Sequence, residues 1–166
     1  MPTLSKSKIK DALNQLSQNA ELFIPLARGE ESGFYPWNSY QAGNDRLMLD
    51  ALNVLLPPKS VVFPQTERMY SFTGNGTAVE IKETFESPQP RIIFGLRGCD
   101  AAAIACFDDV FLTMGFVDNF YQARRDNTTI VAHACYQPGA NCFCEAMGVD
   151  PTEPVNADVI IRDAGD

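Results

Sequence analysis

Residues 135–144, which read Cys-Tyr-Gln-Pro-Gly-Ala-Asn-Cys-Phe-Cys, restrict the possible folds of the chain more than any other segment. Cys135, Cys142 and Cys144, three of the five cysteines of the chain, lie within these ten residues. Pro138 and Gly139 stand between them and favour a turn over a helix or a strand. We therefore expect a loop that folds back on itself and directs three thiols toward one place.

A metal centre explains this loop better than a disulfide does, because three thiols cannot pair among themselves and Cys142 and Cys144 are too close to bridge easily. Cys99, in Leu-Arg-Gly-Cys-Asp, is the best candidate for a fourth ligand. Tetrahedral sulfur ligation is typical of zinc or of an iron–sulfur cluster. The spacing C-x35-C-x6-C-x-C contains neither C-x2-C zinc knuckles nor the ferredoxin run. An iron–sulfur cluster is favoured, and zinc or no metal stay open.

The length and composition indicate a globular protein with its own core. At 166 residues the chain is long enough for one packed domain. No apolar run approaches the roughly 18 residues of a membrane span, and no signal peptide is visible, so we expect a cytoplasmic protein without membrane insertion. In that compartment cysteines indicate metal binding or catalysis rather than a disulfide scaffold. The net charge of −8 argues against a nucleic-acid partner, which would need a basic face.

The first ninety residues predict an irregular α+β half of the chain. The expected elements are an amphipathic helix at 5–17, a strand at 21–27, an aromatic-rich strand at 33–40, a helix from 45 to 56 and a hairpin at 68–81. Pro25 should confine its strand to a sheet edge, because proline cannot donate to a ladder. Residues 85–90 predict a polar linker.

The second half of the chain predicts a parallel sheet. The expected strands are 91–94, 128–132 and 157–162, and the expected helices are 100–114 and 118–126. Strands that alternate with helices and long loops are the pattern of parallel strands joined by helical crossovers. We therefore predict a single α/β domain over residues 1–166. Its short parallel sheet lies in 91–166, and a mixed or antiparallel sheet lies in 1–90.

In this topology Cys99 and Cys135 each lie just past the carboxyl end of a parallel strand, where open α/β sheets bind ligands. Cys99 also begins a helix, whose free N–H groups and dipole are expected to favour its thiolate. Cys142 and Cys144 follow in the loop that leaves the second strand. The four sulfurs can therefore converge on one site.

Three motifs, in this order, resemble the iron–sulfur electron-transfer subunits of soluble anaerobic enzymes. They are Phe-Gly-Leu-Arg-Gly-Cys-Asp-Ala-Ala-Ala-Ile at 94–104, Phe-Tyr-Gln-Ala-Arg-Arg-Asp-Asn at 120–127, and the cysteine loop ending in Cys-Phe-Cys-Glu-Ala-Met-Gly at 142–148. The similar families are the beta subunits of cytoplasmic nickel–iron hydrogenases (sulfhydrogenases) and the iron–sulfur electron-transfer subunits of anaerobic sulfite reductase. The motifs cover most of residues 91–150, and the first ninety residues match only loosely.

The resemblance implies a protein that relays electrons between a flavin-containing partner and a catalytic subunit. It implies a [4Fe–4S] cluster, with [2Fe–2S] as second choice, held by Cys99, Cys135, Cys142 and Cys144. The family usually has proline where Gly98 stands. Members usually continue into a ferredoxin-like module with two C-x2-C-x2-C-x3-C-P runs, and neither run occurs in these 166 residues.

Two other functions stay open. The first is a structural or docking domain whose cysteines bind zinc or nothing. The second is a thiol-based redox enzyme with Cys142 or Cys144 as nucleophile, although no base or C-x-x-C is placed to activate it. The sequence has no Ser-His-Asp set, phosphate-binding glycine loop or dinucleotide fingerprint, so a self-contained active site is not expected.

Several side chains near the motifs have predicted roles of their own. We expect Cys106 to be a buried structural thiol and His133 a hydrogen-bonded core residue. Arg97 could donate hydrogen bonds to cluster sulfurs or pair with an acid at the surface. Arg124 and Arg125 could simply form ion pairs with neighbouring aspartates.

Overall fold

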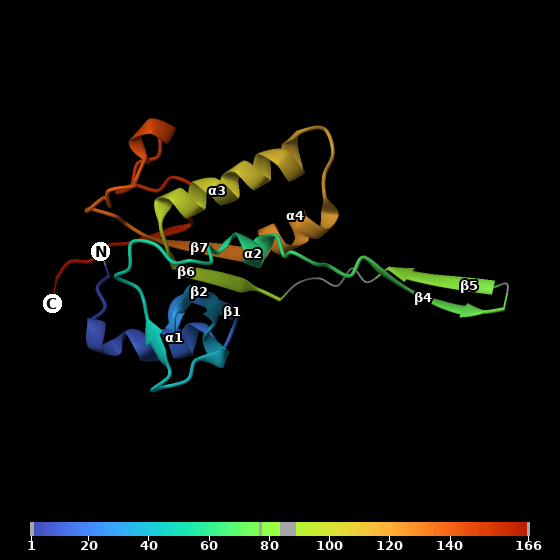
Figure 1. Cartoon of the computed structure of the whole chain (residues 1–166), viewed down its shortest axis with the longest axis horizontal. Coiled ribbons are helices and arrows are strands. Elements are labelled where there is room, and N and C mark those ends of the chain that lie inside the picture. The colour runs from blue at the N-terminus through green and yellow to red at the C-terminus, as the bar shows by residue number, and fades with distance from the viewer. Residues whose placement is uncertain (1, 77, 84–88, 166) are drawn as a thin grey trace.

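The chain folds around one six-stranded sheet with helices on both faces (Figure 1). The computed structural model describes residues 2–76, 78–83 and 89–165. The strand order is β2-β1-β6-β7-β8, and β3 pairs with β1 off this path. The strands are β1 (Glu21–Arg28), β2 (Glu31–Pro36), β3 (Asp45–Leu47), β6 (Arg91–Leu96), β7 (Thr128–His133) and β8 (Val159–Ile161). The predicted α/β fold is confirmed.

Strands β1, β6, β7 and β8 run parallel, and β2 and β3 run antiparallel to β1. The parallel pairing of β1 with β6 places strands from both halves of the sequence in one sheet. Figure 1 shows β6 and β7 side by side in the middle of the fold.

The helices divide between the two faces of the sheet. They are α1 (Ile9–Leu16), α2 (Lys59–Val62), α3 (Gly98–Asp108) and α4 (Asn119–Asp126). Successive side chains of a strand point to opposite faces. Ile93 and Ile130 accordingly pack with α2, α3 and α4, whereas their neighbours Phe94 and Val131 pack with Leu13 of α1. Among the described helices, none has the length and apolar character needed to cross a membrane.

The prediction that Pro25 confines its strand to a sheet edge is wrong, because β1 lies between β2 and β6. Its pairing with β6 ends at Phe23, before the proline. The carbonyl of Pro25 accepts a hydrogen bond from the Met48 amide at 2.9 Å. The missing N–H of Pro25 therefore faces the side of β1 that β6 has already left, where no ladder bond is lost.

The predicted helix over residues 45–56 is also wrong. Residues 45–47 form β3, which pairs with the end of β1, and residues 48–54 follow as an irregular segment that we call the strap. The strap is held through its backbone: Met48 donates to Pro25, and the carbonyls of Leu49 and Ala51 accept hydrogen bonds from Arg97. These tertiary bonds replace those that a helix would have made within itself.

The predicted hairpin is confirmed as β4 (Tyr70–Asn75) and β5 (Ala78–Glu83), which extend away from the sheet (Figure 1). The register pairs Phe72 with Ile81 and puts the large apolar side chains on one face. These side chains, 59–69% exposed, are Tyr70, Phe72, Val79 and Ile81. Of the predicted linker over 85–90, residues 85–88 lie outside the described part of the chain.

Helix α3 begins two residues earlier than predicted and continues beyond Asp108 as a π-helical turn over Asp109–Thr113. Ile104 is buried in the core beneath it. The thiol of Cys106 is exposed, so the prediction of a buried structural thiol is wrong. A cysteine two residues from Ile104 on a helix points to a different side, away from the sheet.

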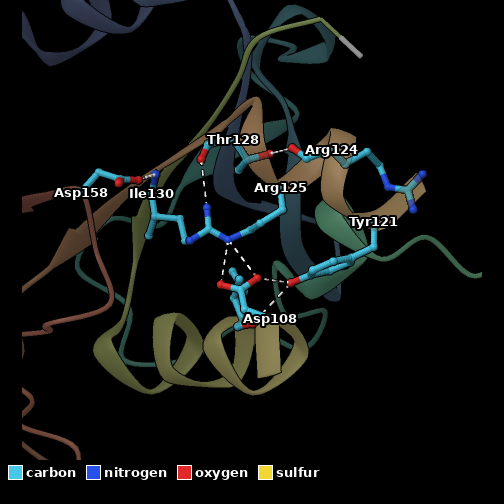
Figure 2. Close-up of polar contacts among 8 residues, drawn as sticks. Asp108, Tyr121, Arg124, Arg125, Thr128, Ile130 and Asp158 are labelled. Atoms are coloured by element: carbon cyan, nitrogen blue, oxygen red, sulfur yellow. Dashed lines mark hydrogen bonds and ion pairs between the residues drawn. The ribbon is translucent and has the colours of Figure 1, made fainter. Parts of the chain in front are cut away.

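A polar network ties α4 to α3 (Figure 2). The carboxylate of Asp108 accepts a hydrogen bond from the hydroxyl of Tyr121 at 2.6 Å and pairs with Nε of Arg125 at 3.0 Å. Arg125 also donates to the carbonyl of Thr128, and Arg124 forms an ion pair with Glu67. The expected ion pairs of the two arginines are thus present, with acids more distant in sequence than their neighbours.

We predict that Asp108→Ala lowers the free energy of unfolding by about 2 kcal/mol, because it leaves the buried Tyr121 hydroxyl and the Arg125 guanidinium without their shared acceptor. Asp109→Ala is the matched control, since Asp109 is exposed and should change stability by no more than about 0.5 kcal/mol. Urea unfolding followed by circular dichroism measures both. Equal midpoints for the two variants would contradict this role of the network.

Candidate functional site

The four cysteines predicted as ligands lie around the carboxyl edge of the parallel strands. Cys99 is the second residue of α3, directly after β6, and Cys135 follows the end of β7 by two residues. Cys142 and Cys144 lie in the loop between β7 and β8, just before the short 3-10 helix Glu145–Met147. Because β6 and β7 pair in parallel, their ends meet at one edge. Figure 1 shows the cysteine loop at the same end of the sheet as the start of α3.

Residues 149–154 connect the backbone beside three of these cysteines. The amide of Cys135 donates to the carbonyl of Pro151 at 2.8 Å, and the amide of Val149 donates to the carbonyl of Cys144 at 2.9 Å. Gly98 packs so closely on this segment that a Cβ there would lie 3.1 Å from Cβ of Pro154. The absence of a side chain at Gly98 thus lets the start of α3 approach the end of the cysteine loop.

The sulfur of Cys142 has a backbone donor. The amide of Gly139 lies 3.2 Å from Sγ of Cys142. A Cβ on Gly139 would come within 2.6 Å of Cδ2 of Leu52 in the strap, so this turn has room only for glycine unless Leu52 moves. Backbone N–H groups directed at cysteine sulfur stabilise the thiolate and tune bound clusters.

All five cysteines are free thiols, and those of Cys135, Cys142 and Cys144 are half-buried. Although Cys99 is exposed by surface area, the protein atoms packed around its thiol, the Asp100 carboxylate and the Cys144 thiol raise the pKa of Cys99 to about 11. The expectation that the helix start favours its thiolate is therefore wrong for the metal-free protein. Backbone N–H groups at the start of α3 do lower the pKa, but lost hydration outweighs them. The contribution of Cys144 places the two thiols near each other.

Among the described residues, no three His, Cys, Asp or Glu side chains form a group that could hold a single metal ion. The elements at this edge therefore bring the cysteines to one neighbourhood without packing their sulfurs around one point.

Arg97 has neither of the roles predicted for it, because its side chain bonds to backbone rather than to sulfur or to an acid. It is 8% exposed. Its guanidinium donates to the carbonyls of Leu49 at 3.2 Å, Ala51 at 2.7 Å and Ala134 at 3.3 Å. The predicted hydrogen bond of His133 is confirmed: Nδ1 lies 3.0 Å from the Leu49 carbonyl, and burial and the Arg97 charge lower the pKa of His133.

The strap is the part of the site that sequence reasoning missed. Its residues meet Arg97, His133 and Gly139 through two backbone carbonyls and the side chain of Leu52. Backbone carbonyls carry no sequence signal, and the segment has the composition of a helix. Nothing in its residue types could have placed it beside the cysteines.

One comparison with known proteins gives a relative. The chain is similar to sulfhydrogenase 2 subunit beta of Pyrococcus furiosus, with 29% identity over 137 residues. The match covers 82% of this chain and 38% of the relative, so the chain spans less than half the length of that protein. No family model and no solved structure matches the chain. The match supports the resemblance to hydrogenase beta subunits, whereas the resemblance to sulfite reductase subunits stays a prediction.

In metal-free protein we predict that Cys99 reacts with iodoacetamide more slowly than Cys106, although both are exposed. With a pKa of about 11, Cys99 is protonated at neutral pH, and only the thiolate reacts. Its rate should rise about tenfold per pH unit and level off only near pH 11. Peptide mapping by mass spectrometry measures both cysteines in one sample. A Cys99 rate that levels off below pH 9 would contradict the raised pKa.

Proposed function

We propose that this chain is an iron–sulfur electron-transfer module of a multi-subunit oxidoreductase, with Cys99, Cys135, Cys142 and Cys144 as the cluster ligands. The observation that carries the proposal is the position of four free cysteines at the carboxyl edge of a parallel sheet, within the region that matches a hydrogenase beta subunit. A ligand set drawn from two adjacent strand ends and one loop needs no long excursion of the chain.

The donor set fits a cluster better than a single ion. Zinc needs four ligands at about 2.0–2.3 Å from one point, and the described residues form no such group. In a cluster each cysteine binds a separate iron, so its ligands span a wider site. Four sulfur ligands favour [4Fe–4S] over [2Fe–2S] as the cluster type.

When bound, the cluster accepts and releases single electrons, and the chain holds and tunes it. The amide of Gly139 donates toward the sulfur of Cys142, and the half-burial of three ligands limits water at the sulfurs. Such hydrogen bonds and the degree of solvent exposure set the potential of a cluster.

Partner subunits are proposed from the relative and from the surface of the cysteine loop. The relative is a subunit of a sulfhydrogenase, and the resemblance implies flavin-containing and catalytic subunits in a cytoplasmic, anaerobic enzyme. Tyr136, Phe143 and Met147, all on the cysteine loop, have exposed side chains. Large apolar side chains gathered on a functional loop are typical of a docking surface.

We predict that anaerobically purified protein contains iron and acid-labile sulfide at about four of each per chain, with the brown colour of a cluster. Cys142→Ser should lose both together, because a hydroxyl replaces a thiolate ligand. Cys106→Ser is the matched control, since Cys106 is exposed on α3 and is not a proposed ligand. It should keep the iron, the sulfide and the visible spectrum.

The competing functions give other results in the same experiment. One zinc per chain in a colourless protein would replace the proposal with a structural or docking domain. Equal iron loss in Cys142→Ser and Cys106→Ser would remove Cys142 from the ligand set.

A further inference from the structure

Arg97 is a buried charged residue beside the candidate site, and its role there is not that of a ligand. Five hydrogen bonds from its guanidinium go to four backbone carbonyls, at distances of 2.7–3.5 Å. A buried guanidinium is costly unless its donors are satisfied, and this side chain has found acceptors in several directions. An arrangement so completely satisfied fixes whatever backbone supplies the acceptors.

The acceptors come from two segments that are far apart in sequence. The carbonyls of His133 and Ala134 lie at the end of β7, immediately before Cys135. The other carbonyls, those of Leu49 and Ala51, belong to the strap. The backbone of Arg97 itself lies at the end of β6, two residues before Cys99. One side chain therefore joins three backbone segments at this edge, two of which lead directly into proposed ligands.

The strap extends this connection to the cysteine loop. Leu52, next to the Ala51 acceptor, packs against Gly139 so closely that a Cβ there would be 2.6 Å from its Cδ2. Gly139 in turn directs its amide at the sulfur of Cys142. Contacts thus run from Arg97 through the strap to the Gly139–Cys142 hydrogen bond.

From these contacts we infer that Arg97 is a positioning residue: its guanidinium sets the end of β7 against the end of β6, and so Cys135 against Cys99, and holds the strap against the cysteine loop. Its consequence for a cluster rests on the proposed function, whereas its effect on the backbone does not. Only arginine offers a planar fork of donors with this reach. Lysine keeps the charge but directs three donors from one nitrogen, so Arg97→Lys should restore the contacts only in part.

The matched control is Arg125→Gln. Arg125 is also a half-buried arginine that bonds to a carboxylate and to a backbone carbonyl, but its partners are Asp108 and Thr128, at the far end of α3 from Cys99. Loss of either arginine should destabilise the fold, which thermal unfolding measures. Only loss of Arg97 should change the strap and the site.

The first measurement is amide hydrogen exchange of metal-free protein, read at Ala51 and Cys135. Their amides bond to the carbonyls of Met48 and Pro151, respectively. In Arg97→Gln both should exchange at least about tenfold faster than in Arg125→Gln, with Arg97→Lys between Arg97→Gln and wild type. If Arg97→Gln does not fold, Arg97→Lys against wild type decides. Exchange at both amides that is unchanged from Arg125→Gln, or from wild type in Arg97→Lys, would overturn the proposal.

The second measurement uses protein that carries the cluster and follows iron loss to a chelator, together with the electron paramagnetic resonance spectrum of the reduced state. Arg97→Gln should lose iron roughly 10–100-fold faster than wild type and show an altered spectrum. Arg125→Gln should show the wild-type spectrum and rate. If wild type binds no iron, the proposed function fails and hydrogen exchange alone decides the role of Arg97. If wild type binds a cluster that Arg97→Gln keeps unaltered, the positioning role fails and the proposed function stands.

Discussion

The parallel pairing of β6 with β7 is the interaction on which the rest of the site depends. It brings the backbone before Cys99 and the backbone before Cys135 to one edge, although 35 residues separate the two cysteines. The ladder contains one irregularity: Phe94 pairs with Val131 and Leu96 pairs with Ala132, so Gly95 is an extra residue. Gly95 has φ of +83°, a conformation that glycine adopts without strain.

This bulge has a local effect on the edge of the sheet. A Cβ on Gly95 would lie 2.7 Å from Cδ2 of Leu49, so the strap crosses the strand where a side chain is missing. The same residue of the strap offers its carbonyl to Arg97 and to His133. The edge of the sheet is therefore closed by backbone groups of an irregular segment, and the buried guanidinium satisfies carbonyls that neither a helix nor a strand uses.

The sequence predicted those parts of the structure that local patterns determine. Apolar spacing was sufficient for α1 and α4, and the Gly74-Asn75-Gly76 turn was sufficient for the hairpin. The order of strands and helices also led to a shared edge for Cys99 and Cys135. These predictions succeeded because propensity and tertiary contacts agree there.

The predictions failed where a tertiary contact overrides a local preference. Residues 45–56 have helical composition, but pairing with β1 and bonds to Arg97 give their backbone other partners. The rule that proline belongs at an edge ignores the point at which a neighbouring strand ends, which decides the case of Pro25. The thiol of Cys99 was judged by its helix start alone, whereas its hydration depends on residues distant in sequence. The ligand set itself stays a prediction.

The β4–β5 hairpin has an evolutionary consequence. Both hydrophobic cores of the sheet are built without its side chains, and it enters and leaves the fold between α2 and β6. A surface excursion of this kind can lengthen or shorten at small entropic cost to the domain. Residues 70–83 can therefore diverge in length and composition among proteins that share this sheet, while the edge that carries the cysteines is retained.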